Sequence, residues 1–465
     1  MSYRMRAEAR EPKTMSNKKY RTGDETEGVI SDFGMSGEGI LKEGAYPIFV
    51  PFAIVGERVR VRINYAKKDY AFADVIEVLT PSDDRVKPRC RYFGRCGGCD
   101  LQHLDAAMQA EVKRLNLQRT LAKNAGLDVV VPSVKTGRPW EYRNKLALPF
   151  GSLGKHGKAV LGFYEKKSHW VVPMRTCPLH GKWAEQLISD VTEWANENGL
   201  RVYDEKSGKG LLRHLVARKL DTLSVTLVVN GDDVPHLNNL VKKLDRHFGD
   251  YVIYVSPNKA DTNVIMGASA VKVYGEERPQ KLGAFSAAVS PMSFLQVNDE
   301  IRDMIYADAC ALLDGFDGDI TELYSGVGLL TAEIASRLPA ACITAVEIVP
   351  EATEDARRLM RSLGCEGRVE EICVDAAEYM RSLSADGMRR ALVVDPPRKG
   401  CAPEVLDAAV AAGYGKIVYI SCNPATLSRD IKFLIGNGYR LTHIQPYDMF
   451  PQTCHVETLV LLCRS

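Results

Sequence analysis

The chain has 465 residues, 45% of them hydrophobic and 26% charged, which is typical of a globular protein with about three domains. Its formal net charge of +2 makes no global case for nucleic-acid binding, so any such case must rest on local patches. No apolar run reaches the roughly 18 residues of a membrane span, and residues 1–22 lack the hydrophobic core of a signal peptide. We therefore expect no membrane contact and a cytoplasmic location, where the twelve cysteines would bind metal or do chemistry.

The N-terminal part of the chain predicts a tail followed by a small barrel. Residues 1–22 contain seven Lys or Arg against two Asp or Glu, so we expect a mobile basic tail that serves solubility more than RNA contact. Short β segments follow in residues 23–80, at 28–33, 39–42, 47–50, 57–64 and 70–79. Five such strands predict a closed barrel of the oligonucleotide-binding type. Arg58, Arg60 and Arg62 share one strand face and are followed by Tyr65 and Lys67, a pattern suited to RNA but also to a solvated strand.

The sharpest metal signal is a group of cysteines at the start of a predicted central α+β domain, residues 81–289. Cys90, Cys96 and Cys99 have the spacing Cys-x5-Cys-x2-Cys, and Cys177 follows about 80 residues later. A local triad with a remote fourth thiolate is typical of iron–sulfur ligation, although zinc also accepts four thiolates and four unrelated buried cysteines are the plainer alternative. The spacing differs from the Cys-x3-Cys-x2-Cys of radical enzymes, which favours a structural site.

The rest of the central region predicts helices at 104–127, 183–196 and 235–248. Strand-like runs occur at 145–150, 159–164, 211–219, 224–229 and 252–255. Residues 140–145 (Trp-Glu-Tyr-Arg-Asn-Lys) place aromatic and cationic side chains together, which suits contact with RNA. No catalytic constellation stands out in this region.

From residue 290 to 465 the pattern becomes that of a doubly wound, Rossmann-like α/β domain, ending in a predicted hairpin of segments 439–447 and 455–462. Gly326 and Gly328 open the first helix, so the backbone can approach a ligand closely. Glu347 ends the next strand, where a carboxylate can hold two ribose hydroxyls, and together with Asp375 it favours an adenosine cofactor. Thr331 stands where a dinucleotide fingerprint has its third glycine, so a methyl donor fits better.

Two further strand tips carry reactive groups. The apolar run 418–420 ends in Ser421-Cys422-Asn423-Pro424, and the run before Asp395 ends in a rigid Pro-Pro turn. Cys422 thus lies beside a helix N-terminus, whose dipole favours a thiolate. Taken alone, a cysteine at such a position is more often an inert core residue.

Five motifs occur in order: Cys-x5-Cys-Gly-Gly-Cys, Ser293-Phe294-Leu295-Gln296-Val297-Asn298, Asp395-Pro396-Pro397-Arg398, Ser421-Cys422-Asn423-Pro424 and His455-Val456-Glu457-Thr458. Together they closely resemble the RNA uracil-5-methyltransferase family, in its iron–sulfur branch with an N-terminal TRAM barrel that binds RNA. The resemblance implies a [4Fe-4S] cluster on the four cysteines, Cys422 as nucleophile and Glu457 as base. It also implies that Gln296, Tyr324, Glu347 and Asp395 line the site for S-adenosylmethionine. Leu329 stands where some members carry a polar residue.

The sequence thus predicts an S-adenosylmethionine-dependent enzyme that methylates C5 of a uridine in RNA, with 23S rRNA as the expected substrate and a monomer as the expected state. His455 and Glu457 are two apart on a predicted strand and would point the same way, so His455 could orient the glutamate or the substrate. A transfer-RNA enzyme, a non-catalytic RNA-binding assembly factor and a radical methylthiotransferase are the alternatives. The intact Cys422 and Glu457 pair argues against the assembly factor, and the cysteine spacing argues against the radical enzyme.

Overall fold

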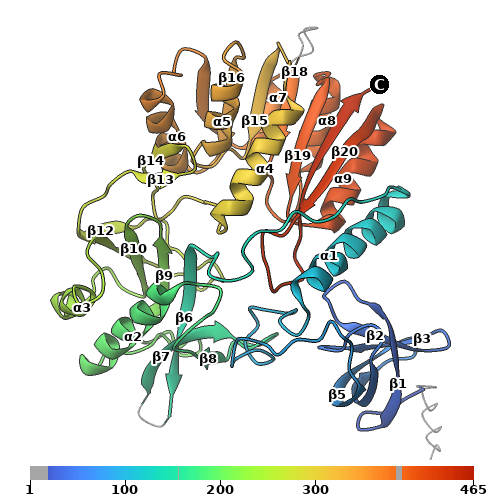
Figure 1. Cartoon of the computed structure of the whole chain (residues 1–465). Coiled ribbons are helices and arrows are strands. Elements are labelled where there is room, and N and C mark those ends of the chain that lie inside the picture. Colours follow the sequence, from blue (N-terminus) through green and yellow to red (C-terminus); the bar gives the residue numbers. More distant parts are fainter. Residues whose placement is uncertain (1–18, 155–156, 384–389) are drawn as a thin grey trace, which may run out of the picture. The chain divides into compact units, whose positions relative to one another are not determined.

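The computed structural model describes residues 19–154, 157–383 and 390–465, so most of the predicted basic tail lies outside the described residues. The chain divides into two compact units (Figure 1). The first unit runs up to Val86 and includes His103–Asp105, and the second contains the remainder. Within the described residues, no helix combines the length and the apolar character that a membrane crossing requires.

The first unit contains a closed five-stranded barrel, as predicted, with the strand order β1-β2-β3-β5-β4. Side chains that alternate along the strands, such as Ile30, Val59 and Val61, fill its interior. The strands are β1 (Glu25–Phe33), β2 (Gly39–Glu43), β3 (Tyr46–Val50), β4 (Arg58–Ala66) and β5 (Ala71–Thr80).

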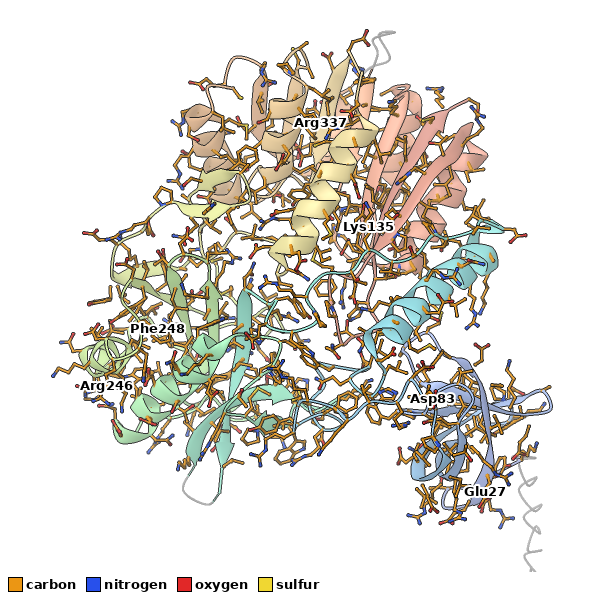
Figure 2. All side chains as sticks on the ribbon, viewed as in Figure 1. Glu27, Asp83, Lys135, Arg246, Phe248 and Arg337 are labelled. Carbon is orange, nitrogen blue, oxygen red and sulfur yellow. The ribbon has the colours of Figure 1, made fainter. Side chains whose placement is uncertain are left out.

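The outward face of β4 carries the three arginines that the sequence analysis singled out. Arg60 lies 2.8 Å from a carboxylate oxygen of Glu27, which Figure 2 labels, and 2.8 Å from one of Glu77. Arg62 pairs with Glu25 at 2.8 Å. These arginines are therefore held in exposed ion pairs, as on a solvated strand face.

The second unit begins with a sheet in the order β12-β11-β10-β9-β6-β7-β8, covered on one face by two helices. Its α+β character agrees with the prediction, but β8, β12 and the hairpin β13–β14 were missed because they are short and carry little apolar pattern. The elements are β6 (Lys145–Leu153), β7 (Lys158–Tyr164), β8 (Val171–Pro173), α2 (Lys182–Glu197), β9 (Leu212–Lys219), β10 (Leu223–Val229), α3 (Leu237–Leu244), β11 (Tyr251–Pro257), β12 (Val271–Tyr274), β13 (Gln280–Leu282) and β14 (Phe285–Ala287).

A second seven-stranded sheet, in the order β17-β16-β15-β18-β19-β21-β20, confirms the doubly wound fold and its final hairpin. All neighbours from β17 to β19 are parallel, and β21 runs antiparallel between β19 and β20. The elements are α4 (Asp299–Leu312), β15 (Asp319–Leu323), α5 (Leu329–Arg337), β16 (Ile343–Glu347), α6 (Pro350–Ser362), β17 (Val369–Cys373), α7 (Ala376–Ser382), β18 (Arg390–Val394), α8 (Pro403–Ala411), β19 (Lys416–Ser421), α9 (Pro424–Gly436), β20 (Tyr439–Tyr447) and β21 (Glu457–Arg464).

Helices cover both faces of this sheet because alternate strand residues are apolar on both sides. Val418 and Ile420 pack in the cluster that contains α4, α5 and α6, whereas Ile417 and Tyr419 pack in the cluster that contains α7, α8 and α9. The predicted helix 104–127 is observed as α1 (Ala106–Thr120) followed by the π-helical turn η1 (Leu121–Ala125), and both contact α9. The strand order reverses between β15 and β18, and in sheets of this kind ligands bind at the carboxyl ends of the strands at such a reversal.

Candidate active site

The register of β19 and β21 brings two predicted catalytic residues to the same edge. Ser421 is the last residue of β19 and pairs with Thr458, so Cys422 and Glu457 occupy the next position along the two strands. Asn423 then caps α9, its side chain accepting a hydrogen bond from the Ala425 amide at 3.1 Å, and Pro424 begins the helix as predicted. A strand pair and a helix start therefore fix Cys422 opposite Glu457.

The buried carboxyl group of Glu457 and the half-buried one of Asp395 both act on the Cys422 thiol. Glu457 is only 1% exposed, and its Oε1 atom has no hydrogen-bond partner within the described residues. Burial and the nearby Asp395 raise the pKa of Glu457 well above its usual value. Burial raises the pKa of Asp395 to about 7, against the effect of Gln296, whose amide donates to Asp395 at 3.3 Å. The two carboxyl groups thus oppose each other's ionisation.

Opposing influences act on the protonation of Cys422. Burial, followed by the charges of Glu457 and Asp395, raises the pKa of the Cys422 thiol to about 11. Burial and the two carboxyl groups thus act against the thiolate that the helix dipole is expected to favour. Arg398 is the cation that lowers the pKa of Cys422.

Arg398 and His455 lie together at this edge. The Arg398 Nη2 atom is 3.2 Å from His455 Nε2, and burial and Arg398 both lower the pKa of His455, so the imidazole is neutral and accepts from the guanidinium. His455 precedes β21, which begins at Glu457, so the prediction that both residues lie on one strand is wrong. Arg398 was not assigned a role from sequence, although the Asp-Pro-Pro-Arg motif contained it. The backbone carbonyl of Arg398 accepts a hydrogen bond from the side-chain amide of Asn423 at 2.9 Å. This contact holds the loop that contains Arg398 against the start of α9.

A tight turn after β15 forms the neighbouring part of the site. Tyr324, Gly326 and Gly328 all have positive φ angles, of 65°, 57° and 75°. A Cβ atom on Gly328 would lie 2.9 Å from that of Ala356, so glycine is needed where α5 approaches α6. The Gly326 amide donates to one carboxylate oxygen of Glu347 at 2.9 Å. The turn and the tip of β16 therefore hold each other in place.

The remaining predicted cofactor residues differ in how far their side chains are already used in hydrogen bonds within the protein. The second oxygen of Glu347 accepts from the Val349 amide at 2.9 Å, so each oxygen keeps lone pairs that could accept from a ribose. Asp375 already caps α7, accepting from the amides of Ala377 and Glu378, which is an ordinary structural role. Gln296 and Tyr324 lie on either side of Asp395, through the amide contact above and the strand pairing of Leu323 with Val394.

Glu322 is a buried carboxyl group that the sequence analysis missed. Burial raises its pKa to about 8, and its Oε2 atom accepts from the Thr331 hydroxyl at 2.7 Å. Thr331 is the residue that replaces the third glycine of a dinucleotide fingerprint, so its hydroxyl has a defined partner. A carboxylate one residue before the strand end at Leu323 was the available sequence signal.

The four predicted metal ligands surround one small cavity. Cys90, Cys96, Cys99 and Cys177 line it together with apolar side chains and the polar side chains of Gln102, Arg143 and His180. Burial raises the pKa of Cys99 to about 12 and that of Cys177 to about 11. In the part of the chain that the structure describes, however, no three His, Cys, Asp or Glu side chains are arranged to hold a single metal ion. The structure therefore brings the four thiols to one cavity without showing a preformed single-ion site.

The chain is similar to known proteins over nearly its whole length. A family model described as tRNA (Uracil-5-)-methyltransferase matches residues 368–465, which include Cys422 and Glu457. The chain is 36% identical to an uncharacterized RNA methyltransferase of Halalkalibacterium halodurans, across 94% of this chain and 97% of that protein. It is 35% identical to one of Clostridium tetani, across 93% and 95%.

A crystal structure of similar fold is that of the Pyrococcus abyssi tRNA (uracil-54, C5)-methyltransferase in complex with S-adenosyl-L-homocysteine. It shares 29% identity and a TM-score of 0.74, covering 94% of this chain and 99% of that one. Identity above 30% with RNA methyltransferases across nearly their whole length, together with the uracil-5 family match over residues 368–465, establishes the relationship. The chain belongs to the RNA uracil-5-methyltransferase family.

Proposed function

We propose that this protein transfers a methyl group from S-adenosylmethionine to C5 of a uridine in RNA, giving 5-methyluridine. The observation that carries the proposal is the register that sets Cys422 opposite Glu457 at the carboxyl edge, next to Asp395. The S-adenosyl-L-homocysteine bound to the Pyrococcus abyssi protein supports the choice of methyl donor.

The reaction needs these residue types. Uracil C5 is too weak a nucleophile to attack a methyl group unaided, and bound S-adenosylmethionine supplies that methyl group as an electrophile. The Cys422 sulfur adds to C6 of the base, which places the negative charge of an enolate on C5 and O4. Once C5 carries the methyl group, Glu457 removes the C5 proton, the C6–S bond breaks and the thiolate of Cys422 is released.

The protonation states give Arg398 a part in this cycle. The raised pKa values of Cys422 and Glu457 favour the protonated forms of both groups in the resting site, yet each must lose a proton before it can act. Arg398 lowers the pKa of both groups. We propose that Arg398 favours the anionic forms of the nucleophile and the base while the substrate excludes water.

The donor would lie against the turn after β15 and the neighbouring strand tips. Glu347 would accept from the ribose hydroxyls, because backbone amides already orient its carboxylate. Gln296, Tyr324 and Asp395 would surround the reacting end of the donor. Asp375 is the weakest member of the set, since its carboxylate already caps α7.

The proposed substrate is 23S rRNA, and transfer RNA is the second candidate. The barrel and the four cysteines suggested ribosomal RNA, with the barrel (23–80) as a TRAM module joined to domains 81–289 and 290–465. The Pyrococcus abyssi tRNA enzyme, however, covers 94% of this chain, so domain content does not separate the two substrates well. Mapping 5-methyluridine in ribosomal and transfer RNA from a deletion strain would decide, because the modification should disappear from one fraction.

A covalent trap tests the proposed reaction directly. The protein would be incubated with the methyl donor and with RNA in which uridine is replaced by 5-fluorouridine. Because fluorine cannot leave C5 as a proton does, we expect an RNA–protein adduct that survives denaturation and maps to Cys422. The Cys422→Ala variant should form no adduct, and methylation by that variant at near wild-type rate would refute the mechanism.

We also propose that the four cysteines hold one [4Fe-4S] cluster. Such a cluster takes one thiolate at each of four irons, so the sulfur atoms need to surround a cavity and need not converge on one point. The lining by four thiols, several apolar side chains and the cation Arg143 fits this group, because the cluster with its four thiolates is anionic. The cluster would brace the chain between residues 90–99 and Cys177.

Anaerobic purification should give brown protein that contains iron and labile sulfide. Cys177→Ala should lose both, whereas Cys310→Ala, which alters a buried cysteine of α4, should keep them. Colourless protein with stoichiometric zinc would contradict the cluster.

A further inference from the structure

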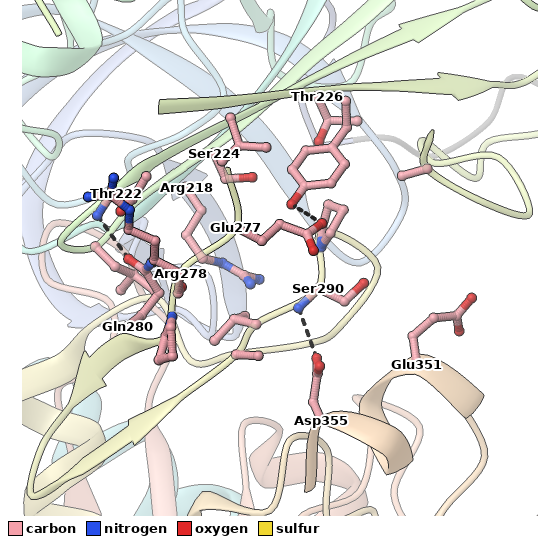
Figure 3. Close-up of a pocket in the computed structure, with 18 of the residues that line it drawn as sticks. Arg218, Thr222, Ser224, Thr226, Glu277, Arg278, Gln280, Ser290, Glu351 and Asp355 are labelled. Carbon is pink, nitrogen blue, oxygen red and sulfur yellow. Dashed lines mark hydrogen bonds between the residues drawn. The ribbon is translucent and has the colours of Figure 1, made fainter. Parts of the chain in front are cut away.

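A cavity of about 630 Å³ lies in the second unit, away from the catalytic edge (Figure 3). One wall is the face of the first seven-stranded sheet that α2 and α3 leave open, and the opposite wall comes from residues 288–291 and the first turns of α6. Cys422, Glu457 and Asp395 do not line it. The volume is in the range of pockets that bind small ligands.

The strand registers place a polar row on the floor of this cavity. Lys145, Arg218, Ser224 and Val252 are direct neighbours across β6, β9, β10 and β11, and all four line the cavity. Side chains one position along each strand point to the other face and pack in the core: Leu146, Ala217, Val225 and Ile253. The polar row is thus built into a sheet whose opposite face is apolar.

Arg218 is a buried cation without a carboxylate partner. It is 7% exposed, its Nη2 atom donates to the Ser293 carbonyl at 2.9 Å, and its Nε atom has no partner within the described residues. Burial lowers the pKa of Arg218 to about 10 and that of Lys145 to about 8, so both are charged or largely charged at pH 7. Neither forms an ion pair within 4.0 Å among the residues described. A buried cation, Arg218, beside a half-buried one, Lys145, is costly unless an anion joins them.

Four acidic residues line the cavity, and two of them, Asp355 and Glu277, accept hydrogen bonds from neighbouring residues; the other two are Glu351 and Glu354 on α6. Asp355 accepts from the Ser290 amide at 2.8 Å and the Ser293 hydroxyl at 3.0 Å, and Figure 3 shows it directed at Ser290. Glu277 accepts from the Tyr254 hydroxyl at 2.8 Å. Asp299 and Asp355 favour the charged form of Arg218 through space, but neither carboxylate forms an ion pair with it.

We infer that this cavity binds the phosphate of a nucleotide on Arg218 and Lys145. The Ser224 hydroxyl would add a hydrogen bond, and Val252 with Tyr254 offers an apolar surface for the base. The phosphate could belong to an unpaired nucleotide of the RNA substrate, which rests on the proposed function, or to a free mononucleotide.

The surrounding contacts link this cavity to the catalytic edge. Arg218 holds the Ser293 carbonyl, and Asn144, next to Lys145, donates to the Gln296 carbonyl at 3.1 Å. Gln296 in turn contacts Asp395. An RNA nucleotide in the cavity would therefore hold in place the segment that carries Gln296.

The test uses the full chain and two probes, fluorescein-labelled hexauridylate and uridine 5′-monophosphate, with uridine as the phosphate-free control. If the phosphate comes from RNA, Arg218→Gln should weaken hexauridylate binding roughly tenfold or more and lower the slope of log affinity against log salt by about 0.7. If it comes from a free nucleotide, uridine 5′-monophosphate should bind and uridine should not. Arg218→Gln should then abolish the binding of uridine 5′-monophosphate and leave the binding of hexauridylate unchanged. Arg246→Gln, beyond α3 on the covered side of the sheet, removes the same charge and should change neither probe (Figure 2).

A second variant keeps the inference testable if Arg218→Gln does not fold. Ser224→Leu keeps both cations but fills the space beside Arg218 on the cavity floor. It should therefore weaken binding of the same probe that Arg218→Gln affects. The inference is overturned if Arg218→Gln and Ser224→Leu both bind both probes like the wild type. These measurements need no methyl transfer, so a protein that fails to methylate RNA would refute the proposed function and still decide the role of the cavity.

Discussion

The carboxyl edge of the α/β sheet and the outer face of β4 in the barrel hold charged groups in opposite ways. At the edge, Glu457 is 1% exposed and leaves a carboxylate oxygen without a partner among the described residues. On β4, the Arg60 side chain is 39% exposed and lies between Glu27 and Glu77. The first arrangement raises the pKa of Glu457, whereas the second lowers the pKa of Glu27, chiefly through its hydrogen bond with Arg60.

The difference teaches where to look for function. Exposed ion pairs are each worth a fraction of a kcal/mol and serve the surface, so they cost the fold little. A buried group whose charged form is disfavoured destabilises the protein, and such groups are concentrated at active sites. Breaking each arrangement should therefore have very different consequences.

The largest effect, on turnover, is expected from changing Glu457, the proposed general base. Glu457→Gln keeps the Cys422 nucleophile but cannot take the C5 proton, so turnover should fall by about 10²–10⁴. Unlike Cys422→Ala, which cannot begin the cycle, it should accumulate an adduct with ordinary RNA that carries the new methyl group. Denaturing gels with labelled methyl donor distinguish the two variants. Normal turnover by Glu457→Gln would remove this residue from the mechanism.

A smaller effect, on the alkylation rate of Cys422, should follow from loss of the Arg398 cation. With a pKa of about 11, Cys422 should react with iodoacetamide about tenfold faster for each pH unit between pH 7 and 10. Because Arg398 lowers that pKa, Arg398→Gln should slow alkylation several-fold at pH 8, and Arg398→Lys should restore most of it. Mass spectrometry of the Cys422 peptide measures the rate, with exposed Cys373 as internal reference. A Cys422 rate that is already constant above pH 7 would contradict the raised pKa.

Much of the fold followed from sequence because it depends on local patterns. The strand tips were visible as apolar runs ending in Glu347, Asp395 and Cys422, and the barrel as short strands between turns. The protonation of Cys422 could not be predicted, since it depends on Glu457 from a strand 35 residues later and on burial that only the assembled sheet creates.

The basic floor of the cavity was missed for the same reason. Lys145 and Arg218 are far apart in sequence and become neighbours only through the pairing of β6 with β9. The arginines of β4, by contrast, were visible as an alternating pattern, but their partners Glu25 and Glu77 lie on other strands. Sequence therefore located the charges and could not say which were compensated.

The buried carboxyl group should also be visible in stability. Because the pKa of Glu457 is raised in the folded state, this residue favours folding only at low pH. Its contribution to the free energy of unfolding is lost as the pH rises above the pKa of the unfolded chain's glutamate, about 4.5. Glu457→Gln should therefore raise the free energy of unfolding by about 1–3 kcal/mol at pH 8 and by less at pH 5. Urea unfolding followed by circular dichroism at both pH values measures this. Glu366→Gln, at an exposed position, should show no such pH-dependent gain.

The smallest effect is expected on the barrel. Arg60→Gln breaks two exposed ion pairs and should change the free energy of unfolding by less than about 1 kcal/mol. Its charge is already compensated by Glu27 and Glu77, so hexauridylate affinity should change by less than about twofold. Lys67 lies over the rings of Tyr65 and Tyr70 and has no carboxylate within ion-pair distance in the described part of the chain, so Lys67→Gln should weaken binding more. If Arg60→Gln proved the more damaging of the two, the ion-paired face of β4 would be the RNA-binding surface, and compensation would be no guide to function in this barrel.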